Sequence, residues 1–125
     1  MATILIIDDQ LVSRQIHSAL IGSVNKSHEI RTFACPLEAL NWATKNPVIL
    51  VLTDYKMPEI NGIEFIRLLR SHPMGVHVPV IMVSADNGSG IREEALEAGA
   101  TDFLVKPLNH HECRERCRAL LEAVT

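Results

Sequence analysis

Short apolar runs alternate with longer segments of mixed polarity along this chain. Four runs, at residues 4–7, 48–52, 78–83 and 103–105, are continuously apolar and rich in valine or isoleucine. Strands that helices cover on both faces have this continuous apolar pattern. A weaker fifth run at residues 30–33 contains Arg31 and Thr32 and is typical of an edge strand. The alternation predicts βα units around a parallel sheet, and therefore an α/β fold.

Helical spacing lies between these runs. Pro36 fits the first turn of a second helix, Gly62 precedes a third, and a fourth follows Gly90 and ends at Gly99. The first helix, within residues 11–24, repeats apolar side chains that we expect on its buried face: Val12, Ile16, Ala19 and Leu20. The last helix carries an apolar stripe that we also expect to be buried: Cys113, Cys117, Leu120, Leu121 and Val124.

Composition narrows the class of protein. A chain of 125 residues with 47% hydrophobic residues fits one packed domain, which we place over residues 1–125. The net charge of -3, with lysine and arginine spread along the chain, argues against direct nucleic-acid binding. No apolar run approaches the ~20 residues of a membrane span, and the start does not resemble a secretion signal. Three sparse cysteines suit reduced thiols, so we expect a cytoplasmic protein.

Polar residues stand where each strong strand ends. Asp8 and Asp9 follow the first, Asp54 the second, Ser84 the third and Lys106 the fourth. Each of these residues alone could simply be a polar residue that ends a strand and has no functional role. Ligands of open parallel sheets bind outside the carboxyl ends of the strands, so four such ends together predict one shared crevice.

Three carboxylates in one crevice raise one another's pKa unless a cation offsets them, which implies a divalent ion. Mg²⁺ prefers oxygen ligands, so we expect Asp9 and Asp54 to bind it directly and Asp8 to act more through water. An aspartate beside Mg²⁺ can attack phosphorus and form an aspartyl phosphate. Lys106 adds a positive charge and Ser84 a hydroxyl donor.

These residues, in this order and spacing, resemble a response-regulator receiver domain of two-component systems over essentially the whole chain. The matching motifs are Asp8-Asp9, the segment Asp54-Tyr55-Lys56-Met57-Pro58 with Gly62, Ser84-Ala85 and Lys106-Pro107. The resemblance implies a doubly wound, five-stranded parallel sheet in order 2-1-3-4-5, the flavodoxin-like receiver fold, with helices on both faces. It also implies a phosphoacceptor in phosphorelay signalling that assists its own phosphorylation and dephosphorylation and is not a dedicated enzyme.

The resemblance also implies individual roles. Asp54 would accept the phosphoryl group from a sensor histidine kinase or phosphotransfer protein, and Ser84 and Lys106 would hold the phosphoryl oxygens. Asp8, Asp9, Asp54 and the backbone carbonyl of Lys56 would bind Mg²⁺. The peptide before Pro107 is expected to be cis.

Signalling would pass through a Ser84/Phe103 switch, which changes how an effector domain or protein binds the surface of helix four, strand five and helix five. Phe103 stands where many relatives carry tyrosine, so its switching would rest on ring packing. A further conjecture pairs Lys56 with Asp86 over the phosphoryl group. The segment 52–70 resembles receivers that precede cyclic-dinucleotide phosphodiesterase domains, and both a stand-alone regulator and the front piece of a longer one stay open.

Alternatives fit the sequence less well. A small phosphatase would carry Asp-x-Asp after the first strand, where this chain has Asp8-Asp9-Gln10, and a flavin-binding domain would need a phosphate loop there. A degenerate receiver that serves only as an interaction module would not need the full polar set. His110, Cys113 and Cys117 have a spacing that could bind a metal, although we favour buried thiols in the core.

Overall fold

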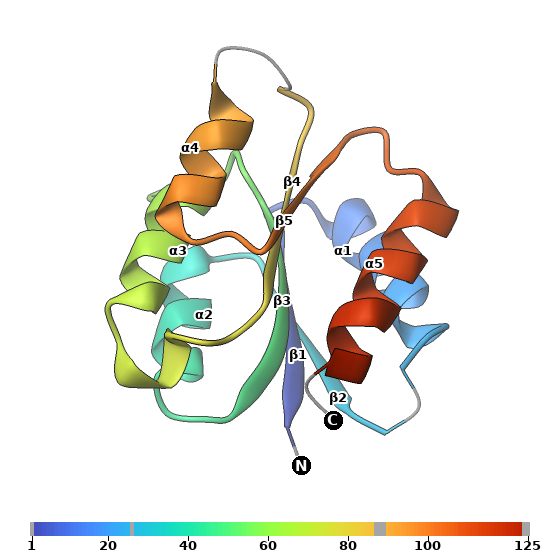
Figure 1. The fold of residues 1–125 in the computed structure, drawn as a ribbon, viewed down its shortest axis with the longest axis horizontal. Coiled ribbons are helices and arrows are strands. Elements are labelled where there is room, and N and C mark those ends of the chain that lie inside the picture. The colour runs from blue at the N-terminus through green and yellow to red at the C-terminus, as the bar shows by residue number, and fades with distance from the viewer. Residues whose placement is uncertain (1, 26, 87–89, 124–125) are drawn as a thin grey trace.

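The computed structural model describes residues 2–25, 27–86 and 90–123 (Figure 1). In chain order, its elements are β1 (Thr3–Ile7), α1 (Leu11–Gly22), β2 (Glu29–Phe33), α2 (Pro36–Ala43), β3 (Val48–Asp54), α3 (Gly62–Arg70), a 3₁₀ turn (Pro73–Gly75), β4 (Val80–Ser84), α4 (Ile91–Ala98), β5 (Asp102–Val105) and α5 (His110–Ala123). All strand pairs in these residues are parallel, and the sheet has the order β2-β1-β3-β4-β5. The predicted fold class and strand order are confirmed.

Helices cover both faces of the sheet. Seen along the sheet, α2, α3 and α4 lie on one side, and α1 and α5 lie on the other (Figure 1). Every residue of β1 is buried, whereas every residue of β2 is exposed or only partly buried. The continuous apolar runs therefore correspond to strands that helices cover, and the weak run corresponds to the predicted edge strand, β2.

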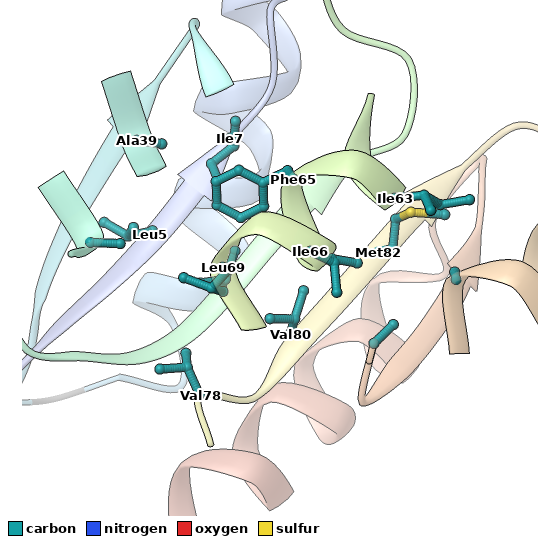
Figure 2. Close-up of a cluster of buried hydrophobic side chains, with 14 of the residues drawn as sticks. Leu5, Ile7, Ala39, Ile63, Phe65, Ile66, Leu69, Val78, Val80 and Met82 are labelled. Carbon is teal, nitrogen blue, oxygen red and sulfur yellow. The ribbon is translucent and has the colours of Figure 1, made fainter. Parts of the chain in front are cut away.

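The larger apolar core lies between the sheet and α3. Phe65, Ile66 and Leu69 of α3 belong to the same buried cluster as Val80 and Met82 of β4 (Figure 2). Phe65 is fully buried. A second core fills the other face, and Cys113 and Cys117 of α5 are buried in it, as the apolar stripe predicted.

The buried face of α1 differs from the predicted one. Val12 and Ile16 are 66% and 45% exposed, and Ala19 is also exposed. The helix is rotated so that His17, Leu20 and Ile21 face the sheet. The prediction followed the apolar residues, but a histidine takes one of the inward positions. A smaller difference is that β4 begins at Val80 and not at residue 78, because Pro79 has no N–H to donate to a neighbouring strand. Val124 of the predicted α5 stripe lies outside the described residues.

The side chain of Arg70 links the C-terminal ends of α3 and α4. Nε and Nη2 of Arg70, at the end of α3, donate to the carbonyl of Gly99 over 3.1 and 2.7 Å, and Nη1 donates to the carbonyl of Gly75 over 2.6 Å. Gly99 ends α4 with φ of 117°, a conformation that favours glycine. The C-terminus of α4 is therefore anchored to α3. None of the described helices has the length and apolar character needed to span a membrane.

Candidate functional site

The polar residues predicted at the strand ends meet at one edge of the sheet. Asp8 follows β1, Asp54 ends β3, Ser84 ends β4 and Lys106 follows β5. A cleft of about 270 Å³ opens there. It is lined by Asp9, Gln10, Asp54, Lys56, Ser84, Ala85, Asp86 and Lys106. The parallel sheet thus gathers side chains that are up to about a hundred residues apart in sequence.

Asp54 lies at the centre of this cleft. It is 8% exposed, and its Oδ1 accepts a hydrogen bond from the backbone N–H of Tyr55 over 2.9 Å. Its Oδ2 lies 3.1 Å from Nζ of Lys106. One oxygen is thus fixed by the backbone, and the other faces an ammonium group.

The acidic pair completes a three-carboxylate cluster. Three carboxylate oxygens, one from each of Asp8, Asp9 and Asp54, lie within 4.8 Å of one another. Asp8 is fully buried, and its Oδ1 accepts the Gln10 backbone N–H over 2.9 Å. Its Oδ2 has no hydrogen-bond partner among the described residues. Asp9 is exposed at the cleft.

Burial raises the pKa of Asp8 above its ordinary value, and the negative charge of Asp54 adds to this effect. The Gln10 N–H and the Lys106 ammonium act in the opposite direction. A buried carboxylate oxygen without a partner is unfavourable, so a cation placed between the three acids would stabilise the ionised cluster. The three atoms that could bind a metal are all carboxylate oxygens, which are the ligands that Mg²⁺ prefers.

The two residues of the predicted switch lie at different levels of the sheet: Ser84 lines the cleft, and Phe103 of β5 pairs with Met82 of β4. Ser84 is 2% exposed, and its Oγ accepts the Asp86 backbone N–H over 2.9 Å. Phe103 is 3% exposed in the larger core, and the Arg92 guanidinium lies 5.9 Å from the centre of its ring. The ring is therefore already packed inside the protein in this structure.

Close backbone packing shapes the segment after Asp54. A Cβ atom on Gly62 would lie 2.5 Å from the Asp54 carbonyl oxygen, too close for any other residue without a shift. The Gly62 N–H donates to the Tyr55 carbonyl over 2.8 Å. The Lys106 N–H donates to the Ser84 carbonyl over 2.9 Å, and the Lys106–Pro107 peptide is cis, the conformation that the resemblance implied.

Two residues beside the acids were not anticipated from the sequence. Nη1 of Arg14 donates to the Asp8 carbonyl over 2.8 Å, and Nδ1 of His17 lies 3.9 Å from Oδ2 of Asp8. The sequence feature that could have identified His17 as inward-facing is its spacing, three and four residues before Leu20 and Ile21, which are buried on the same helix face. In contrast, His110 is exposed while Cys113 and Cys117 are buried, and within the described part of the chain the acidic trio is the group whose geometry could hold a metal ion.

Comparison with known proteins agrees with this geometry. The family model for the response regulator receiver domain matches residues 4–118. The chain is 40% identical over 119 residues to the cyclic di-GMP phosphodiesterase response regulator RpfG of Xanthomonas campestris. That alignment covers 95% of this chain and 32% of RpfG, so the chain spans about a third of this relative's length.

Solved structures match along nearly the whole chain. The chemotaxis protein CheY4 of Vibrio cholerae has a TM-score of 0.85 at 28% identity, covering 96% of this chain and 98% of that chain. The receiver domain of the Pseudomonas aeruginosa sensor histidine kinase PA1611, solved with magnesium in its active-site cleft, has a TM-score of 0.85 at 26% identity, covering 97% and 98%. With its parallel sheet and its acidic cleft, the chain belongs to the response regulator receiver domain family.

Proposed function

We propose that residues 1–125 form a single receiver domain that accepts a phosphoryl group on Asp54 in a phosphorelay, and that it is a signalling switch and not a dedicated enzyme. The observation that carries this proposal is the pairing of Asp54 with two further carboxylates and with the Lys106 amine, 3.1 Å away, in an open cleft. The donor would be a sensor histidine kinase or a phosphotransfer protein in the cytoplasm.

In the transfer, a carboxylate oxygen of Asp54 attacks the phosphorus atom of a phosphohistidine. The new O–P bond forms as the N–P bond breaks, and the bonding electrons stay with the imidazole nitrogen of the donor. Lys106 and Ser84 donate hydrogen bonds to the phosphoryl oxygens. Mg²⁺, held by Asp9, Asp54 and the Lys56 carbonyl with Asp8 acting through water, would neutralise negative charge on the phosphoryl group.

The surface beside the cleft supports a macromolecular donor. Leu11, Val12 and Ile16, near the start of α1, are 58%, 66% and 45% exposed. Ile16 and Lys106 line one hollow. Exposed apolar side chains next to a reactive cleft are typical of a protein-binding surface. The α1 face that the sequence predicted as core is therefore our candidate for donor docking.

The signal would pass from Ser84 to the surface of α4, β5 and α5. To reach a phosphoryl oxygen, the Ser84 hydroxyl would give up the hydrogen bond that it now accepts from the Asp86 backbone N–H. Since Phe103 is already buried, phosphorylation would secure its packing beneath Arg92 and would not need to create it. Each new charge-assisted hydrogen bond is worth about 1.5–3 kcal/mol, against the ~5.5 kcal/mol that a complete population shift requires. We expect a graded shift that effector binding completes.

Mass spectrometry after exposure to acetyl phosphate and Mg²⁺ tests the proposal. The wild type should gain the mass of one phosphoryl group, and Asp54→Asn should gain none. Asp102→Asn is the matched control, because Asp102 pairs with Arg116 away from the cleft and its loss should leave labelling intact. Labelling that persists in Asp54→Asn would contradict the assignment of the acceptor.

Lys56 and Asp86 are proposed to control the lifetime of the phosphoryl group. Both line the cleft beside Asp54. If they shield the phosphorus from water, Lys56→Ala should change the decay rate of the aspartyl phosphate, measured by the loss of labelled protein over time. An unchanged decay rate would exclude this role for Lys56.

A second proposal concerns the output. RpfG is named as a cyclic di-GMP phosphodiesterase response regulator, and the 40% identity favours a receiver that controls a cyclic-dinucleotide phosphodiesterase in a longer regulator. Measuring phosphodiesterase activity of a full-length protein with and without the phosphoryl mimic beryllofluoride tests it. No difference between the two states would remove this output.

A further inference from the structure

A buried histidine lies beneath the acidic cluster. His17 is 6% exposed on the inner face of α1, next to the apolar Leu20 and Ile21. An imidazole is unfavourable in such a place unless a polar group compensates it. The polar group that it approaches is Asp8, whose carboxylate is fully buried.

The two oxygens of Asp8 have different surroundings. Oδ1 is fixed by the Gln10 backbone N–H over 2.9 Å. Oδ2 is the buried oxygen without a hydrogen-bond partner in the described residues, and Nδ1 of His17 lies 3.9 Å from it. That separation is longer than a direct hydrogen bond, but it is within reach of one bridging water or a small movement of the two side chains.

His17 can donate a hydrogen bond from this position. An imidazole carries at least one N–H donor in either protonation state. A donor beside Oδ2 can therefore orient the Asp8 carboxyl group at the acidic cluster.

We propose that His17 is a positioning residue of the magnesium site: its Nδ1–H holds Oδ2 of Asp8, directly or through one water, and so keeps that carboxylate turned toward Asp9 and Asp54. This inference rests on the proposed function, since it requires Mg²⁺ at the acidic cluster. Partners of this kind, one step removed from the metal, typically change metal affinity by about 10-fold to 100-fold when they are lost.

The competing explanation is packing alone, in which His17 fills space between α1 and the sheet. The two explanations differ in what a replacement must preserve. Leucine keeps an apolar side chain of similar size but has no donor. Asparagine is smaller, but its amide nitrogen occupies nearly the place of Nδ1 and still donates.

Mg²⁺ titration of the full chain, followed by calorimetry, separates them. His17→Leu should raise the Kd for Mg²⁺ about 10-fold, and His17→Asn should restore most of that loss. His110→Leu is the matched control, because His110 lines the same hollow as His17 but is exposed. Its Kd should stay within about twofold of the wild type, well below the effect expected from losing a ligand-orienting group.

An NMR measurement on the wild type keeps the test independent of variants that fail to fold. Long-range ¹H–¹⁵N spectra should show the Nδ1-protonated tautomer of His17 in the presence of Mg²⁺. The Nε2-protonated tautomer would overturn the inference, as would wild-type affinity in His17→Leu or equal losses in His17→Leu and His17→Asn. A wild type that binds no Mg²⁺ would overturn the magnesium site together with this inference, whereas normal binding by both wild type and His17→Leu overturns the inference alone.

Discussion

Two neighbouring helices on the same face of the sheet are held in very different ways. Among its described residues, α3 buries Gly62, Ile63, Phe65, Ile66 and Leu69, while α4 buries Ala95. Fully burying a large apolar side chain contributes about 1.5–3 kcal/mol, so burial holds α3 far more strongly than α4.

The beginnings of the two helices differ in the same sense. Asn61 accepts the Glu64 N–H over 2.9 Å, and the Glu64 carboxylate accepts the Asn61 N–H over 2.8 Å, which is a complete capping box. The residue at the N-cap of α4 is Gly90, which has no side chain to cap the helix. Helix α3, which follows the strand that ends at Asp54, is thus firmly held, and α4, which follows the strand that ends at Ser84, is lightly held. A lightly held helix can respond to phosphorylation at a small cost in free energy.

The largest expected effect concerns the anchor of α3. Phe65→Ala should lower the free energy of unfolding by about 3–5 kcal/mol, because it leaves a cavity in the larger core. Urea denaturation followed by circular dichroism measures it. A loss below about 1 kcal/mol would mean that α3 is not the anchored helix of this pair.

Hydrogen exchange compares the two helices directly. Amides of α4 should exchange at least about 10-fold faster than those in the centre of α3, a difference of about 1.4 kcal/mol in opening free energy. Beryllofluoride with Mg²⁺ should slow exchange in α4 more than in α3. Equal protection of both helices before and after the addition would remove the proposed contrast.

The cap of α3 is the next effect in size. Asn61→Ala should cost about 1 kcal/mol of stability, because the Glu64 N–H loses its acceptor. Glu97→Ala, at an exposed position of α4, is the control and should change stability by no more than about 0.5 kcal/mol. Thermal unfolding of the three proteins gives the comparison, and a neutral Asn61→Ala would show that the box is dispensable.

The smallest stability effect is expected on the surface of α4. Leu96 is 41% exposed, so Leu96→Ala should change the free energy of unfolding by about 0.5 kcal/mol or less. If α4 is an output surface, the same substitution should still weaken binding of the effector by several-fold. A strong loss of stability would instead place Leu96 in the core of the protein.

The sheet and its polar edge were predictable because each strand leaves a clear pattern. Continuous apolar runs identified β1, β3, β4 and β5, and a polar residue after each run marked the cleft. The strand order came from the resemblance to receivers, because periodicity alone does not reveal which strands are neighbours. The roles of Asp54, Ser84 and Lys106 remain predictions that labelling can test.

The exact inward face of α1 was beyond the sequence pattern. Apolar spacing favoured Val12 and Ile16, but both are exposed, and His17 turns inward. A pattern assumes that apolar side chains are buried and polar ones are not. That assumption fails at His17, whose ring lies 3.9 Å from the buried carboxyl group of Asp8, and at Val12 and Ile16, whose apolar side chains stay exposed.

The contacts of Arg70 have a mechanical consequence for α4. They hold the Gly99 end of a helix of eight residues, which is about 12 Å long. A rigid rod held at one end swings and does not slide, so a tilt of about 10° would displace its far end by about 2 Å. That far end is the start of α4, which lies at the same edge of the sheet as the end of β4 (Figure 1). Displacements of α4 would therefore be greatest beside the acidic cleft and would fade toward the opposite end of the molecule.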